Sequence, residues 1–172
     1  MNNKLVIAGF AGVGKTMLAK KYSNVIDLDA ADYKYNRTES TRLSLEELKG
    51  TMREANKDWP GNYIDIIKKS IKKYDIVLIW IHPEILEIYD KYNIDYILCY
   101  PTKGNESIYK NRYIKRGNSD NFINKVIDSY NYRIEQFESM DKEKIILNNN
   151  ETLEGWLLKS NYILKTKINT DL

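Results

Sequence analysis

Cysteine is almost absent from the sequence, and this scarcity already restricts how the fold can be held together. The single residue, Cys99, cannot form a disulfide bond within the chain. Free thiols are typical of a reducing compartment, so we expect a cytoplasmic protein. Cys99 lies in an apolar stretch and is predicted to be part of the core.

Long apolar runs and a strong excess of one charge are also missing. No stretch approaches the ~20 apolar residues of a membrane-spanning helix, and residues 1–4 lead into the first apolar segment without a signal-peptide pattern. We therefore expect no membrane partner. The net charge is only +3, and the basic run 68–73 is predicted to be a solvated helix face, so nucleic acid is not expected as a partner.

The length and the even composition predict one domain. The 172 residues are enough for a sizeable core and too few for two ordinary domains. The sequence contains no repeat, linker or low-complexity segment. We therefore predict a single domain over residues 1–172.

A glycine-rich stretch near the amino terminus carries the clearest chemical signal. Residues 9–16, Gly-Phe-Ala-Gly-Val-Gly-Lys-Thr, fit the pattern G-x-x-x-x-G-K-[ST] of a phosphate-binding loop. Glycines allow the backbone to turn its N–H groups inward, where they can contact phosphate oxygens. An apolar segment precedes this stretch and a helical pattern follows it, which is the setting that the motif requires. The sequence predicts binding of a nucleoside triphosphate.

The alternation of apolar segments predicts an α/β fold. Strands are predicted over 4–8, 24–29, 75–81, 95–100 and 144–147. Helices are predicted after the glycine-rich stretch and over 62–73, 105–117, 119–137 and 153–164, with another that begins at Pro83. The end of the chain from Lys165 onward is expected to be frayed.

Acidic residues follow the second predicted strand. Asp27, Asp29 and Asp32 lie where a parallel sheet places its ligands, beyond the carboxyl end of a strand. We expect these carboxylates to face the same site as the glycine-rich stretch, and at least one of them to take part in chemistry. His82, the single histidine, follows the third strand and is predicted to have a turn or capping role.

Arginine is rare compared with lysine, so its positions are informative. Only six of the 27 basic residues are arginines. Three of them (Arg37, Arg42, Arg53) lie in a polar segment over 34–61, and two (Arg112, Arg116) are four residues apart on the helix after the fourth strand. Guanidinium groups bind phosphate through a planar pair of donors. We interpret 34–61 as an acceptor-binding flap and 103–119 as a lid.

The order of these segments resembles the nucleoside monophosphate kinase family. Asp27-Leu28-Asp29 is also similar to the D-x-D of shikimate and gluconate kinases. Together with Tyr100-Pro101 and the stretch 112–117, it resembles small kinase-like proteins of bacteriophages and their bacterial hosts. Where adenylate kinases carry Asp-Gly-x-Pro-Arg, this chain has residues 80–84, Trp-Ile-His-Pro-Glu.

This resemblance implies a three-layer α/β/α P-loop kinase fold with a five-stranded parallel sheet in the order 2-3-1-4-5. It implies ATP and Mg²⁺ as cofactors, with a nucleotide as the acceptor. The implied catalytic residues are Lys15, Asp29, Arg112 and Arg116, and the implied magnesium ligands are Thr16, Asp27 and Asp29. ATP phosphates would contact Gly9, Gly12, Val13, Gly14, Lys15 and Thr16. The acceptor would contact Asp32, Arg37, Arg42 and Arg53.

The function expected from these features is phosphoryl transfer from ATP to a small acceptor, foremost a nucleoside or deoxynucleoside 5′-monophosphate. A small-metabolite or nucleoside kinase is the nearest alternative, because only the acceptor changes. A P-loop ATPase of another class and a catalytically silent nucleotide-binding regulator remain further alternatives.

Overall fold

The structure, a computed structural model, describes residues 4–36, 54–149 and 151–167. Its centre is one parallel sheet in the order β2-β3-β1-β4-β5, which confirms the predicted fold class and strand order. The strands are β1 (Leu5–Gly9), β2 (Val25–Asp27), β3 (Ile76–Trp80), β4 (Ile97–Pro101) and β5 (Lys144–Leu147).

The strand β1 lies in the middle of the sheet and is buried along its whole length. It pairs with β3 from Leu5 opposite Ile76 to Gly9 opposite Trp80, and with β4 on its other side. Such continuous apolar strands are expected in a parallel sheet that helices cover on both faces. Cys99 is buried in β4 as predicted, and burial raises the pKa of its thiol to about 12.

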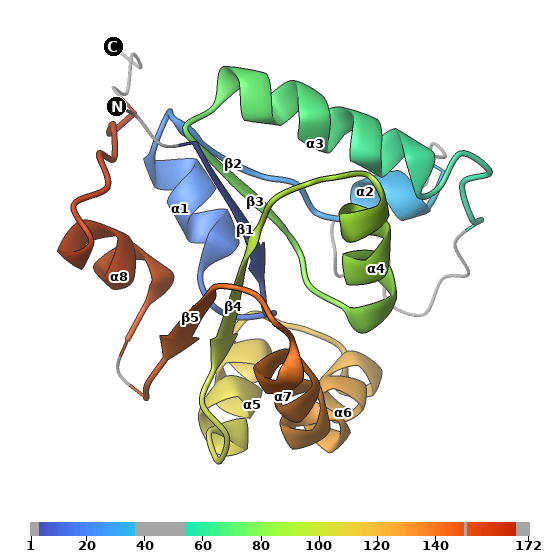
Figure 1. The fold of residues 1–172 in the computed structure, drawn as a ribbon. Helices are drawn as coiled ribbons and strands as arrows, with labels where there is room; N and C mark the ends of the chain where they lie inside the picture. Colours follow the sequence, from blue (N-terminus) through green and yellow to red (C-terminus); the bar gives the residue numbers. More distant parts are fainter. Residues whose placement is uncertain (1–3, 37–53, 150, 168–172) are drawn as a thin grey trace, which may run out of the picture.

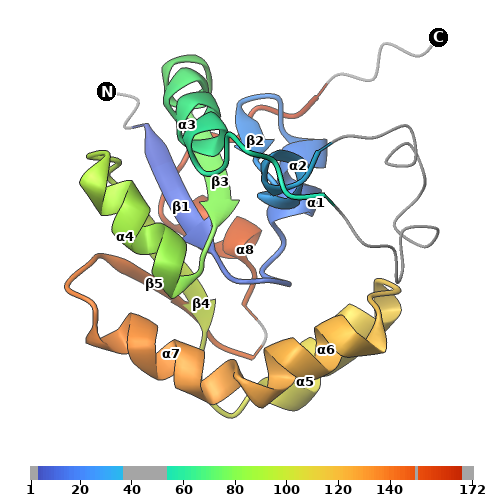
Figure 2. The same cartoon turned by 90° about the vertical axis from the view of Figure 1, so that its right-hand side faces the viewer.

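Helices cover both faces of the sheet, which gives the predicted three layers. In Figure 1, α1 and α8 lie on one side of the strands and α3 and α4 on the other. Figure 2 shows α5, α6 and α7 as an arc across the carboxyl ends of the strands. The helices are α1 (Lys15–Lys21), α2 (Ala31–Lys34), α3 (Gly61–Lys73), α4 (Pro83–Lys91), α5 (Glu106–Lys115), α6 (Asp120–Asp128), α7 (Tyr130–Ser139) and α8 (Leu153–Lys159).

Two predicted helix boundaries were wrong. The single long helix expected over 119–137 is divided at Ser129, whose hydroxyl donates to the carbonyl of Lys125 at 2.8 Å. The last helix ends at Lys159 instead of Leu164, because Asn161 adopts a left-handed conformation (φ 60°) that stops it.

The segment after α8 is anchored, contrary to the expectation that the chain frays from Lys165. The buried side chain of Asn24 donates to the carbonyl of Ile163 at 2.7 Å and accepts from the N–H of Lys165 at 2.9 Å. The N–H of Lys167 donates to the carbonyl of Lys21 at 3.0 Å. These bonds tie the segment to the start of β2.

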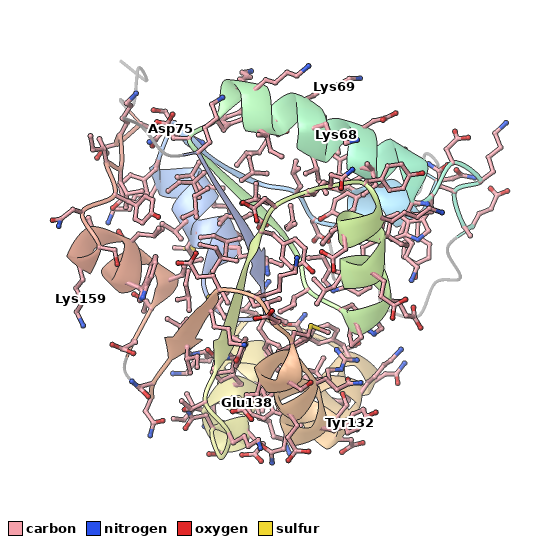
Figure 3. All side chains as sticks on the ribbon, in the orientation of Figure 1. Lys68, Lys69, Asp75, Tyr132, Glu138 and Lys159 are labelled. Atoms are coloured by element: carbon pink, nitrogen blue, oxygen red, sulfur yellow. The ribbon has the colours of Figure 1, made fainter. Side chains whose placement is uncertain are left out.

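The basic run on α3 forms an exposed helix face, as the sequence predicts. Lys68 and Lys69, both labelled in Figure 3, are exposed, and the Lys68 ammonium group lies 5.3 Å from the ring centre of Tyr92, whereas Ile67 is fully buried. Within the described ranges, no helix is both long and apolar enough to cross a membrane.

Candidate active site

The glycine-rich stretch forms a loop between β1 and α1. Gly12 and Gly14 have φ values of 85° and 102°, which side chains rarely tolerate. The N–H of Phe10 donates to the carbonyl of Cys99 at 2.8 Å and its ring is buried, so the start of the loop is fixed to the core. Within the described residues, the N–H groups of Gly14, Lys15 and Thr16 donate to no protein acceptor. They are free to bind an anion at the start of α1.

Lys15 turns back over this loop. Its Nζ donates to the carbonyls of Gly9 at 2.7 Å and Phe10 at 3.1 Å. Burial lowers the pKa of Lys15, and the carboxylate of Asp27 partly opposes that effect. The ammonium group therefore lies inside the loop, where it would meet the phosphates of a bound nucleotide.

Asp27, the last residue of β2, faces the start of α1. Its Oδ2 accepts a hydrogen bond from the Thr16 hydroxyl at 2.8 Å, and its Oδ1 is buried with no hydrogen-bond partner among the described residues. Burial raises the pKa of Asp27, and Lys15 and Thr16 act in the opposite direction. A buried carboxylate oxygen without a partner is costly unless a cation or a water molecule contacts it.

The Thr16 hydroxyl and the Asp27 carboxylate fit a magnesium ion. Mg²⁺ prefers oxygen ligands and is usually held by one or two protein groups, with water and phosphate completing its shell. Among the residues that the structure describes, no group of three or more His, Cys, Asp or Glu side chains could hold a metal ion. The donor set is therefore suited to an ion shared with a bound phosphate.

The other two predicted acids lie differently from Asp27. Asp29 is exposed, and its Oδ1 accepts from the N–H of Ala31 at 2.9 Å, so it caps the turn into α2. It still acts electrostatically on Lys15. Asp32 is exposed in the first turn of α2. Asp27 is the carboxylate of the three that is hydrogen-bonded to Thr16, within the part of the chain that the structure describes.

The predicted lid arginines lie on α5, next to the loop. Arg112 donates from Nη1 to the carbonyl of Gly12 at 3.1 Å, and its guanidinium group lies 4.6 Å from the ring centre of Tyr109. Arg116 ends α5 and acts electrostatically on both Lys15 and Asp27. The structure thus brings together residues that are about 100 positions apart in the chain.

The predicted acceptor-binding arginines cannot be placed in the same way. Arg37, Arg42 and Arg53 lie outside the described residues. The flap is described only at its two ends, where Tyr35 forms an antiparallel bridge with Ala55. Their predicted contacts with an acceptor stay predictions.

Arg133 on α7 is a cationic residue that the sequence analysis did not single out. It is half-buried, and burial lowers its pKa. Its guanidinium group makes no hydrogen bond or ion pair with any residue in the described part of the chain. It acts electrostatically on Tyr113 of α5 and on His82. In the sequence, Arg133 is the one arginine outside the segments 34–61 and 103–119. No motif around it indicated a functional role.

His82 occupies the N-cap position of α4, which agrees with the predicted turn or capping role, although its side chain makes no capping hydrogen bond. Its carbonyl accepts from Ile85 and Leu86 at the start of α4, while its imidazole stacks on the indole of Trp80, with ring centres 5.0 Å apart. Burial lowers the pKa of His82, and the nearby Arg133 adds to this effect. The neutral ring is therefore favoured.

Comparisons with known proteins give little beyond the fold. The sequence matches no protein-family model and no curated protein. Among solved structures, the chain is similar to the tunicamycin resistance protein of Deinococcus radiodurans, with 9% sequence identity and a TM-score of 0.49, over 94% of this chain and 97% of that one. Such a distant likeness carries no argument about function. The strand order and the loop after β1 show a P-loop kinase-like topology.

Proposed function

We propose that the protein transfers the terminal phosphoryl group of ATP to a small acceptor, most specifically a nucleoside or deoxynucleoside 5′-monophosphate. The observation that carries this proposal is the arrangement around the loop. Lys15 lies inside it, the Thr16–Asp27 pair borders it, and Arg112 and Arg116 approach it from α5. Positive groups thus surround the position at which negative charge would develop.

The chain's own residues would act by positioning and by neutralising charge. The free N–H groups at the start of α1 would bind the ATP phosphates, and Lys15 would neutralise the group in transit. Thr16 and Asp27 would hold Mg²⁺, which supplies further charge neutralisation when it is bound. Asp29 remains a candidate for orienting the attacking oxygen. In the reaction, the terminal P–O bond of ATP breaks, a bond forms to the acceptor oxygen, and ADP leaves.

The half-buried Arg133 supports an anionic reactant. Among the described residues its guanidinium group has no carboxylate partner, and such a group is unfavourable when it is partly removed from water. A phosphate between α5 and α7 would provide that partner. We therefore add Arg133 to Arg112 and Arg116 as a residue that would contact the transferring phosphoryl group or the acceptor phosphate.

A motor-type ATPase is the less favoured alternative. Such enzymes place an acidic residue at the end of a central apolar strand, where it holds the metal and activates water. Here β3 ends at Trp80 and contains no acid, and Asp75 precedes the strand. Hydrolysis of ATP stimulated by nucleic acid would nevertheless overturn the kinase proposal in favour of this one.

The decisive experiment measures ATP consumption with each ribo- and deoxynucleoside monophosphate, and with nucleosides and hydroxylated metabolites. We expect ADP to form with at least one phosphorylated acceptor. Lys15→Ala should lower that rate about 10²- to 10³-fold, because it removes a charge that stabilises the transition state. Lys20→Ala is a matched control, since Lys20 is exposed on the same helix. A Lys15→Ala protein as active as the parent would contradict the proposal.

A further inference from the structure

Three aromatic rings lie beside the phosphate loop, on elements that the mechanism above does not use. Trp80 is the last residue of β3 and is directly opposite Gly9, the first residue of the loop. His82 stacks on Trp80, with planes 20° apart, and the ring centre of Trp59 is 6.5 Å from that of Trp80. We call Trp59, Trp80 and His82 the aromatic platform.

Ring stacking and hydrogen bonds of two buried tyrosines fix the platform to the core. The buried Tyr63 stacks on Trp59 with ring centres 5.4 Å apart. Its hydroxyl donates to the carbonyl of Leu28 at 2.7 Å and accepts from the N–H of Trp80 at 3.1 Å. The Tyr89 hydroxyl donates to the carbonyl of Trp80 at 3.0 Å. These bonds fix the carboxyl ends of β2 and β3, and with them the orientation of the rings.

The platform differs from the aromatic residues of the core. Tyr63, Tyr89 and Tyr100 are fully buried, whereas all three platform rings keep part of their surface open to solvent. Partly exposed aromatic surface at the carboxyl edge of a parallel sheet lies where such sheets bind ligands. It offers flat apolar area on which a ring can stack.

Polar groups around the platform have capacity left for a ligand. The buried Nδ1 of His82 and Oδ1 of Asn62 have no hydrogen-bond partner in the described part of the chain. Asn62 uses its amide group to bind the carbonyl of Tyr33 at 2.8 Å. The ammonium group of Lys34 lies 5.9 Å from the ring centre of Trp59 and 5.7 Å from that of Trp80. A positive charge is therefore next to the rings.

We propose that the aromatic platform binds a planar heterocyclic ring of the acceptor by stacking, with His82 and Asn62 available to its polar edge. The inference rests on the proposed phosphotransfer and narrows its acceptor. Stacking on an aromatic side chain accepts any base, because every base has a π-face. An acceptor that carries a nucleobase fits this site, whereas a sugar phosphate or a hydroxy acid leaves the rings unused.

The position of the platform agrees with this assignment. Trp80 and Gly9 are neighbours on adjacent strands, so a ring on the platform lies close to a phosphate in the loop. The Lys34 ammonium group, which is close to both indole rings, would be a nearby positive charge for the phosphate of such an acceptor.

The test uses the protein's own fluorescence, without ATP. The chain has three tryptophans, and Trp156 lies apart on α8, stacked on Tyr162. In a Trp156→Phe background, the two platform tryptophans are the only ones left. We expect a saturable change in emission with at least one nucleoside monophosphate, and none with ribose 5-phosphate at the same concentrations. Equal responses to both, or no response to any nucleotide, would overturn the inference.

Variants of the platform supply an independent measurement by calorimetry. His82→Ala and Trp59→Leu should each weaken binding of the responding nucleotide about 5- to 150-fold, as expected for the loss of one stacking ring. Trp59→Tyr should retain most of the affinity, because it retains a ring. Glu87→Gln is the control, since Glu87 is exposed on α4. Unchanged affinity in both ring-removing variants would also count against the platform.

The two proposals can fail separately. If the protein phosphorylates only an acceptor without an aromatic ring, and does so in a Lys15-dependent way, the result would support the phosphotransfer and contradict the role of the platform. Conversely, the parent protein could bind a nucleotide that the platform variants bind only weakly, and yet consume no ATP with any acceptor. That result would support the aromatic platform and contradict the proposed phosphotransfer.

Discussion

At the scale of single residues, Asp27 links stability to function. Its carboxylate is held between Thr16 and the Lys15 ammonium, yet burial still raises its pKa above the ordinary 3.8. The ionised form is therefore less favoured in the folded protein than in the unfolded chain. Residues at functional sites often carry such a cost, which a bound ligand then relieves.

The sign of the pH dependence follows from that shift. The stabilising contribution of Asp27 is fully present below pH 3.8 and is lost as the pH rises through its higher pKa in the folded protein. Asp27→Asn should flatten the dependence of Tm on pH in this window and leave the nucleotide-free protein at least as stable at pH 7. Activity should fall about 10- to 100-fold, as for loss of a group that orients a metal. Thermal denaturation across pH, with activity assays, checks both.

Asp65→Asn is the matched control, because Asp65 is exposed on α3, on the outer surface. It should leave the activity unchanged. A variant at Asp27 that keeps the parent's pH profile would show that this carboxylate is not the group that titrates.

At the scale of the helices, α5 is seated directly on the phosphate loop. The Tyr113 hydroxyl donates to the carbonyl of Ala11 at 2.8 Å, and Arg112 binds the next carbonyl, that of Gly12. A Cβ atom at Gly12 would lie 3.1 Å from the Tyr113 ring and 3.2 Å from that of Tyr109. Both rings are buried and have little room to move. The position of α5 and the shape of the loop are therefore coupled.

Gly12→Ala tests this coupling, and Gly104→Ala is its control. Both glycines have positive φ, 85° and 79°, but a Cβ atom at Gly104 meets nothing within 4 Å. Gly104→Ala should therefore show only the backbone cost of about 1–2 kcal/mol. Gly12→Ala should lose more stability and should also weaken ATP binding, which chemical denaturation and calorimetry can measure. If the two variants lose the same amount of stability, the rings of α5 do not restrict the backbone at position 12.

At the scale of the whole molecule, the segment 162–167 joins the last helix to the amino-terminal half. Besides the bonds of Asn24, its Lys165 lies 3.7 Å from Asp75, just before β3. Truncation after Ser160 would leave the buried Asn24 side chain without two of its partners. An unpaired buried polar group costs about 1–3 kcal/mol, so Tm should fall by several degrees.

Truncation after Lys167 keeps every described contact of this segment and serves as the control. The Tm of the shorter chain is compared with that of this variant. If both truncations unfold at the parent's temperature, the segment contributes nothing to stability.

The sequence predicted much of this architecture because local signals determine it. Apolar runs such as 76–80 and the glycine pattern of 9–16 identify strands and loop without knowledge of tertiary contacts. The break at Ser129 escaped prediction because apolar spacing continues through it. Serine often occurs within helices, so its identity gave no warning.

Other contacts between distant segments could not be predicted from the sequence. The pairing of Asn24 with 163–165 joins residues about 140 positions apart, and nothing local marks either partner. The same is true of Trp59, Trp80 and His82, which only the folded sheet brings together. Asp27 and Asp29 looked equivalent in the sequence, but the turn into α2 uses Asp29 for its own cap.

The hydrogen bonds of Lys15 to the carbonyls of Gly9 and Phe10 mean that this cation is already satisfied before any nucleotide arrives. An incoming triphosphate must exchange those two bonds for new ones, so the resting complex gains little net affinity from the exchange. The interaction of Lys15 with the phosphoryl group becomes stronger only in the transition state, when that group carries its greatest negative charge. Lys15 should therefore increase kcat more than it increases the affinity for the triphosphate.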